Sequence, residues 1–207
     1  MLRGLRLGLL LAALYFAASY AAPTPNILVF GDSISAAYGM RVEEGWVSLL
    51  QKKLTTQGYG YHVVNASVSG ETTDGGRARL ARALAVQRPG ILILELGGND
   101  GLRGLPLDEV RANLEAMIDA ARKGGSRVLL LGMRIPPNYG ATYAARFHAI
   151  YGELADKYRL PFVPFLLDKV ALDPEMIQQD GLHPNAQAQP QLLEAIWPAL
   201  RPMLARS

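Results

Sequence analysis

Residues 27–35 read Ile27-Leu28-Val29-Phe30-Gly31-Asp32-Ser33-Ile34-Ser35, an apolar run followed at once by a turn rich in small and polar residues. The four apolar residues are too few for a helix and show no polar alternation, which is typical of a strand covered on both faces. Such strands occur in parallel sheets, where functional groups gather just beyond the carboxyl ends of the strands. The turn that begins at Gly31 is therefore the first place to look for a functional site.

Similar apolar runs recur along the chain and alternate with helical patterns. The further runs are Val63-Val64, Ile91-Leu92-Ile93-Leu94, Val128-Leu129-Leu130-Leu131 and a weaker one at Phe162-Val163 with Phe165. Apolar spacings of three and four predict helices over Val47–Leu54, Val110–Ala121, Tyr143–Leu154 and Pro190–Leu200, and a further helix is predicted over Thr72–Val86. This alternation predicts the α/β class: a three-layer α/β/α sandwich around a five-stranded parallel sheet of flavodoxin-like order 2-1-3-4-5.

The composition is that of a folded protein without thiol chemistry. The chain has 207 residues, of which 50% are hydrophobic and 19% charged, and this length suits a single domain. Cysteine is absent from the sequence, so disulfides, thiolate metal sites and a cysteine nucleophile are excluded. The turn after the first strand is neither a G-x-G-x-x-G nor a Walker-type loop, which argues against dinucleotide binding and phosphoryl transfer.

The first 21 residues have the pattern of a secretory signal peptide. Arg3 and Arg6 precede an uncharged run, and Ser19 and Ala21 supply small residues at positions −3 and −1 of a cleavage site after Ala21. We therefore expect residues 22–207 to form the mature domain in the periplasm, or to be secreted. An uncleaved membrane anchor is the alternative.

Cleavage of this segment also changes what the charge implies about partners. The formal net charge falls from +3 to +1 when the two arginines of the signal peptide are removed. Nucleic acid is therefore not an expected partner. The remaining arginine cluster is predicted to form a solvated helix face, and its members are Arg77, Arg79, Arg82 and Arg88.

Small or polar residues follow three of the predicted strands. Ser33 follows the first, Gly70 the second and Asn99 the third. Taken singly, each has an ordinary structural explanation, as a helix N-cap, a loop glycine and a loop asparagine. In the predicted strand order the first strand lies between the second and the third, so the three residues are expected within a few ångströms of one another.

Asp180 and His183 lie in one turn near the C-terminus and supply a carboxylate and an imidazole. At this spacing the carboxylate can bind one ring nitrogen while the other faces outward, as a general base requires. Metal ligation is the alternative, but a zinc site needs three or four ligands, and His62 and His148 are not expected to converge on it. The hydroxyl, base, carboxylate and N–H donors together predict acyl transfer, with no metal or organic cofactor required.

These motifs resemble those of the SGNH (GDSL-type) hydrolases. The four family motifs stand here, in family order, as Gly31-Asp32-Ser33-Ile34-Ser35, Gly70, Gly97-Gly98-Asn99-Asp100 and Asp180-Gly181-Leu182-His183. The resemblance implies that Ser33 is the nucleophile, His183 the general base and Asp180 its partner. It further implies an oxyanion hole formed by the backbone N–H groups of Ser33 and Gly70 and by the side chain of Asn99.

The resemblance also implies a serine esterase that acts on acyl thioesters, lysophospholipids and aryl esters through an acyl-enzyme on Ser33. An acetylesterase acting on carbohydrate esters is an alternative within hydrolysis, and a non-catalytic exported binding domain is an alternative outside it. We expect a monomer with no obligate protein partner.

The resemblance to the SGNH hydrolases also implies a groove that binds the substrate. A mobile loop over residues 101–106 is expected to cover the acyl chain, with Leu102 and Leu105 in contact with lipid. The rest of the apolar groove is expected to be lined by Ile34, Tyr38, Met40, Ile135 and Pro137, with Arg134 placed to meet a polar head group. Packing beneath a loop explains each of these residues equally well.

Overall fold

Parallel strands form the centre of the computed structural model, which describes residues 25–206. Within these residues there are five, namely β1 (Asn26–Gly31), β2 (His62–Asn65), β3 (Ile91–Glu95), β4 (Arg127–Leu131) and β5 (Phe162–Val163). Their order across the sheet is β2-β1-β3-β4-β5, which confirms the predicted fold class. The predicted signal peptide and its cleavage site lie outside the described residues.

The register of the sheet brings the carboxyl ends of β1, β2 and β3 side by side. Val29 of β1 lies opposite Asn65 of β2 on one side and opposite Ile93 of β3 on the other. Two positions further along, Gly31 lies opposite Glu95. The segments that follow these three strands therefore start at the same edge of the sheet.

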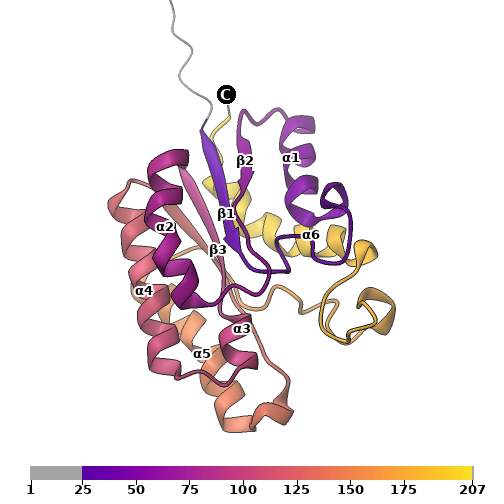
Figure 1. Cartoon of the computed structure of the whole chain (residues 1–207). Coiled ribbons are helices and arrows are strands. Elements are labelled where there is room, and N and C mark those ends of the chain that lie inside the picture. The colour runs from indigo at the N-terminus through magenta and orange to yellow at the C-terminus, as the bar shows by residue number, and fades with distance from the viewer. Residues whose placement is uncertain (1–24, 207) are drawn as a thin grey trace, which may run out of the picture.

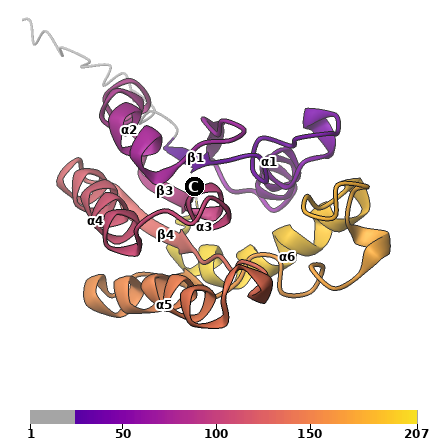
Figure 2. The same ribbon diagram turned by 60° about the horizontal axis from the view of Figure 1, so that its bottom comes forward.

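Helices cover both faces of the sheet, as Figures 1 and 2 show. Helices α1 (Trp46–Thr56) and α6 (Gln189–Leu200) pack on one face, and α2 (Thr73–Gln87), α4 (Leu107–Lys123) and α5 (Ala141–Tyr158) on the other. Alternate residues of each strand enter opposite cores. Ile27 and Val29 pack toward α1 and α6, whereas Leu28 and Phe30 pack toward α2 and α4.

Short helices fill several connections. Helix α3 (Gly98–Leu102) follows β3 directly. Single 3₁₀ turns occur at Val42–Glu44, Pro137–Tyr139, Pro174–Met176, Ala186–Ala188 and Arg201–Met203. None of the helices within residues 25–206 is both long and apolar enough to cross a lipid bilayer.

Two local features differ from the sequence-based expectations. Asn99 and Asp100 are predicted to lie in a loop, but they belong to helix α3, although the two glycines of this helix disfavour helical structure. Tertiary contacts override this preference: the carboxylate of Asp100 accepts hydrogen bonds from Thr73 at the start of α2, from the backbone N–H at 2.9 Å and from the hydroxyl at 2.5 Å. Phe165 lies beyond the end of β5, where it packs half-buried against the core.

Candidate active site

Ser33, His183 and Asp180 form a continuous chain of hydrogen bonds. Oγ of Ser33 lies 2.9 Å from Nε2 of His183, and Nδ1 of His183 lies 2.6 Å from Oδ2 of Asp180. Ser33 and His183 are 150 positions apart in the sequence, so it is the fold that brings them together. This arrangement allows the imidazole to take the hydroxyl proton while the carboxylate holds the opposite ring nitrogen.

The turn that carries His183 is fixed by neighbouring polar groups. The backbone N–H of Gln178 donates to the carbonyl of His183 at 2.8 Å, and the side-chain amide of Gln178 donates to the carbonyl of Tyr38 at 2.8 Å. The ring of Tyr38 packs against the imidazole, with the ring centroids 4.7 Å apart. Tyr38 thus supports the imidazole and is not among the residues that line the cavity beside it.

Hydrogen bonds keep Asp180 in its ionised form. Its Oδ1 atom accepts from the backbone N–H of His183 at 3.0 Å and from that of Leu182 at 2.9 Å. These bonds, the one from His183 foremost, lower the pKa of Asp180 to about 2. Near neutral pH the ionised carboxylate holds the proton of His183 on Nδ1, so Nε2 is free to accept a proton from Ser33.

Two backbone N–H groups near Ser33 are free to donate. Those of Ser33 and Gly70 have no hydrogen-bond partner within the part of the chain that the structure describes. Gly70 has φ of +79°, in the left-handed region that favours glycine, although an added Cβ would meet no atom within 4 Å. Backbone conformation rather than lack of space therefore explains why this position is a glycine.

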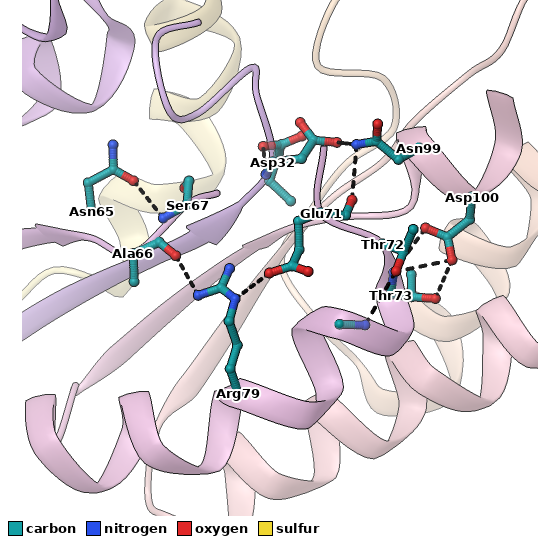
Figure 3. A network of polar contacts seen from close by, with 12 residues as sticks. Asp32, Asn65, Ala66, Ser67, Glu71, Thr72, Thr73, Arg79, Asn99 and Asp100 are labelled. Atoms are coloured by element: carbon teal, nitrogen blue, oxygen red, sulfur yellow. Dashed lines mark hydrogen bonds and ion pairs between the residues drawn. The ribbon is translucent and has the colours of Figure 1, made fainter. Parts of the chain in front are cut away.

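The side chain of Asn99 is already engaged, as Figure 3 shows. Its Nδ2 atom donates to Oδ2 of Asp32 at 3.1 Å and to the backbone carbonyl of Glu71 at 2.9 Å. These two acceptors fix the direction of the amide at the start of α3. An amide NH₂ has two protons, so an oxyanion bound by Asn99 must share or replace one of these acceptors.

Arg79 braces the loop between β2 and α2, on which Gly70 lies (Figure 3). Its guanidinium pairs with Glu71 and donates to the carbonyl of Ala66 at 2.7 Å. It also lies over the ring of Phe30, 3.9 Å from the centroid. One side chain of α2 therefore ties both ends of this loop to the core of the sheet.

The expectation that Arg79 belongs to a solvated helix face is therefore wrong. Arg77, Arg82 and Arg88 are exposed as predicted, but Arg79 is half-buried. The reason is that the neighbouring loop offers a carboxylate and a carbonyl to a guanidinium at this position, and helical spacing alone gives no sign of them.

An apolar cavity of about 90 Å³ lies beside Ser33 and His183. Four of the residues expected to bind substrate line it, namely Ile34, Leu102, Arg134 and Ile135. A larger groove of about 390 Å³ adjoins it, shares Arg134 and Ile135, and is lined in addition by Pro137. The structure thus places most of the expected groove residues along one path that starts at Ser33.

Leu105 and Met40 are not on this path. The backbone of Leu105 is tied down, since its N–H donates to the carbonyl of Asp100 at 3.0 Å and its carbonyl accepts from the Tyr143 hydroxyl at 2.8 Å. The loop expected over residues 101–106 also starts later than predicted, because Gly101 and Leu102 belong to α3. Neither Leu105 nor Met40 is among the residues that line the cavity or the adjoining groove.

Residues 29–189 match the model of the GDSL-like Lipase/Acylhydrolase family. The chain belongs to this family. Esterase TesA of Pseudomonas aeruginosa is 50% identical to it over 183 residues, which are 88% of this chain and 91% of that protein. Thioesterase 1/protease 1/lysophospholipase L1 of Escherichia coli strain K12 is 39% identical over 184 residues, 89% of this chain and 87% of that protein. The crystal structure of TesA has a TM-score of 0.84 to this structure at 50% identity, and the match covers 86% of this chain and 99% of that one.

Membership of the GDSL-like family confirms the resemblance stated from the four motifs. In this family member the first motif starts at the last residue of β1, the third starts two residues after the end of β3, and the second lies in the loop after β2. The fourth motif comes from the long connection between β5 and α6, which folds back over the same edge of the sheet.

Neither of the other two histidines contacts Ser33 or His183. His62 is exposed at the start of β2. His148 on α5 contacts two residues that line the cavity: its Nδ1 lies 3.0 Å from the carbonyl of Met133, and its Nε2 accepts from Nε of Arg134 at 3.3 Å. Among the described residues, no group of three histidine, cysteine or carboxylate side chains is placed to hold a metal ion.

Sequence reasoning missed one residue at the centre of this GDSL-like site. Glu95 is fully buried at the end of β3 and accepts a hydrogen bond from the hydroxyl of Ser35 at 2.6 Å. The signal that points to it is an acidic residue placed directly after the apolar run of a buried strand. A carboxyl group at such a position needs a specific partner, because burial of an unpaired polar group is costly.

Proposed function

We propose that this member of the GDSL-like family is a serine hydrolase that cleaves carboxylic esters and thioesters through an acyl-enzyme on Ser33. The observation that carries the proposal is the chain of hydrogen bonds from Asp180 through His183 to Ser33. The free backbone N–H groups of Ser33 and Gly70 lie near this chain. These are the parts that acyl transfer requires: a nucleophile, an oriented base and donors for a developing negative charge.

The reaction follows from the geometry. As Oγ of Ser33 attacks the substrate carbonyl, His183 takes the hydroxyl proton, and the N–H groups of Ser33 and Gly70 stabilise the oxyanion. The amide of Asn99 is the third proposed donor. His183 then gives its proton to the leaving alcohol or thiol, and a water molecule activated by His183 releases the acid and regenerates Ser33.

The apolar cavity and its adjoining groove support substrates with an acyl chain. Leu102 and Ile135 line this cavity and are the proposed apolar contacts, and the exposed Arg134 is the proposed partner of a polar head group. Acyl thioesters, lysophospholipids and aryl esters are therefore the proposed substrates, and the names of the two relatives support the first two of these. No cofactor is proposed.

We further propose that residues 1–21 are a cleaved signal peptide and that the mature protein acts in the periplasm as a monomer. The sequence pattern of these residues supports export. The intact mass of protein recovered from the periplasmic fraction tests the proposal, and a mass that still includes residues 1–21 would overturn cleavage.

A fluorophosphonate probe tests the central proposal. We expect covalent labelling of the wild type and loss of both labelling and ester hydrolysis in Ser33→Ala, because the probe reacts with an activated serine hydroxyl. Ser126→Ala is the matched control, since Ser126 is also buried but lies at the start of β4, at the amino end of the sheet. Labelling of Ser33→Ala equal to that of the wild type would contradict the proposal.

A further inference from the structure

Glu95 reaches the turn that carries Ser33 because the turn begins with a glycine. Gly31 and Glu95 are register partners at the ends of β1 and β3. A Cβ added to Gly31 would lie 2.3 Å from Oε2 of Glu95 and 2.9 Å from Oγ of Ser35. The glycine of the first family motif is thus explained by the close approach of a buried carboxyl group.

The contacts of Glu95 bracket Ser33 in the sequence. Oε2 of Glu95 accepts from the backbone N–H of Asp32 at 3.2 Å and from the hydroxyl of Ser35 at 2.6 Å. All three of these side chains are at least nine-tenths buried. The residue before Ser33 and the second residue after it are therefore held by the same carboxyl oxygen.

Asp32 extends these contacts to the oxyanion site. Its Oδ1 atom accepts from the backbone N–H of Ile34 at 3.1 Å, and its Oδ2 atom accepts from Nδ2 of Asn99 at 3.1 Å. One carboxylate thus binds both the turn around Ser33 and the amide that is proposed to stabilise the oxyanion.

We infer that Glu95 is a positioning residue, which together with Asp32 forms a buried acid pair that holds Ser33 and Asn99 in their relative positions. The inference rests on the proposed function, because it takes Ser33 as the nucleophile. It assigns Glu95 a role in turnover, although Glu95 touches neither the cavity nor His183.

The surroundings of the pair assign the proton to Glu95. Its two donors, a backbone amide and a hydroxyl, are uncharged, so they bring no positive charge to the buried carboxyl group. Burial, and then the charge of Asp32, raise the pKa of Glu95 well above its usual value. Burial raises the pKa of Asp32 only to about 6, because hydrogen bonds from Ile34, Glu95 and Asn99 favour its charged form. The pair therefore holds its proton on Glu95 rather than on Asp32.

A neutral carboxyl group can be replaced by an amide, and this gives a sharp test. Glu95→Gln keeps an acceptor for Asp32 and Ser35 and should keep kcat within about threefold of the wild type. Glu95→Met has a similar size but no acceptor, and we expect kcat to fall roughly ten- to a hundredfold, the cost of a displacement of about 1 Å at a reacting group. KM should change less than about threefold, since the groove is untouched.

Ser35→Ala provides a milder version of the same test, for the case in which Glu95→Met does not fold. It removes one of the two contacts of Glu95 and should lower kcat by about tenfold or less. Ser126→Ala is its matched control, because the Ser126 hydroxyl is equally buried and donates to the carbonyl of Pro89, also at 2.6 Å, but at the opposite end of the sheet. The control should lose stability without loss of kcat.

Fluorophosphonate labelling rates separate this inference from the proposed function. A wild type that is not labelled on Ser33 would overturn the proposed function itself. A wild type that is labelled, together with wild-type kcat in Glu95→Met or Ser35→Ala, would overturn the role of Glu95 alone. Equal losses of kcat in Glu95→Gln and Glu95→Met, with both proteins folded, would overturn the assignment of the proton to Glu95.

Discussion

At the scale of single residues, the site depends on where protons reside. Two backbone N–H groups lower the pKa of the exposed Asp180, whereas burial and the nearby Asp32 raise the pKa of Glu95. One carboxyl group orients an imidazole and the other supports a turn. The same chemical group thus serves two purposes because its surroundings differ.

His183 and Asp180 should differ in how much their loss costs. His183→Ala removes the proton carrier and should lower kcat on the order of 10⁴-fold or more, whereas Asp180→Asn should retain more activity because Asp180 mainly orients the ring. Steady-state kinetics of both folded variants provides the measurement. His62→Ala, on an exposed edge of the sheet, is the control and should behave as the wild type. Equal losses of kcat in the two site variants would contradict the ranking.

The buried carboxyl group of Glu95 should also affect how the stability of the protein depends on pH. The folded state keeps the proton of Glu95 to a higher pH than the unfolded chain does, so the free energy of unfolding of the wild type falls as pH rises above the unfolded-state pKa of about 4.5. Glu95→Gln should not show this decrease, because glutamine does not titrate. Urea unfolding from pH 5 to 8 measures this effect. The free energy of unfolding of Glu95→Gln relative to that of the wild type should increase with pH, by at most about 1.4 kcal/mol per pH unit. Parallel pH dependences would rule out a raised pKa for Glu95.

At the scale of elements, the strands could be predicted and one helix could not. Short apolar runs such as Ile91–Leu94 predicted all five strands. Strands buried on both faces carry no polar alternation, whereas the edge strand β2 is only partly buried. Helix α3 was missed because its glycines oppose a helix, and it is the distant Thr73 that holds Asp100 within it. Ser33 and His183 could be proposed from their motifs, but Glu95 and Arg79 act through contacts that local spacing does not encode.

The contact between α2 and its preceding loop yields an element-scale prediction. Arg79→Met leaves Glu71 without its ion pair and frees the loop that carries Gly70. We expect the free energy of unfolding to fall by about 1–3 kcal/mol and kcat to fall about tenfold, because an oxyanion donor is displaced. Arg82→Met, on the exposed side of the same helix, should change neither. Thermal unfolding and steady-state kinetics provide the measurements. If the two variants behave alike, Arg79 does not brace the loop.

At the scale of the whole molecule, the cavity and groove proposed as the substrate path are assembled from distant parts of the chain. Ile34 comes from the turn after β1, Leu102 from α3, Ile135 from the segment after β4, and Leu167 from the segment after β5. Each segment leaves the same edge of the sheet, so the fold class alone predicts that they meet there. The shape of the path required the structure, because it depends on side-chain packing.

This path predicts a preference among acyl chains. Octanoyl esters should be hydrolysed with a higher kcat/KM than acetyl esters of the same alcohol, because the groove beyond Ile135 adds apolar contacts that an acetyl group cannot reach. A series of p-nitrophenyl esters from two to twelve carbons measures it. Equal or better turnover of the acetyl ester would favour the acetylesterase alternative.

The distance of 150 positions between Ser33 and His183 has a consequence for biosynthesis. A ribosome delivers the serine early and the histidine near the end, and a hydroxyl without its base is as inert as any other alcohol. An unfinished or partly unfolded copy of this enzyme therefore cannot attack the lipids of the cell that makes it. With this topology, we expect hydrolysis to begin only once the final segment of the chain has docked, so the protein stays inactive during its own synthesis.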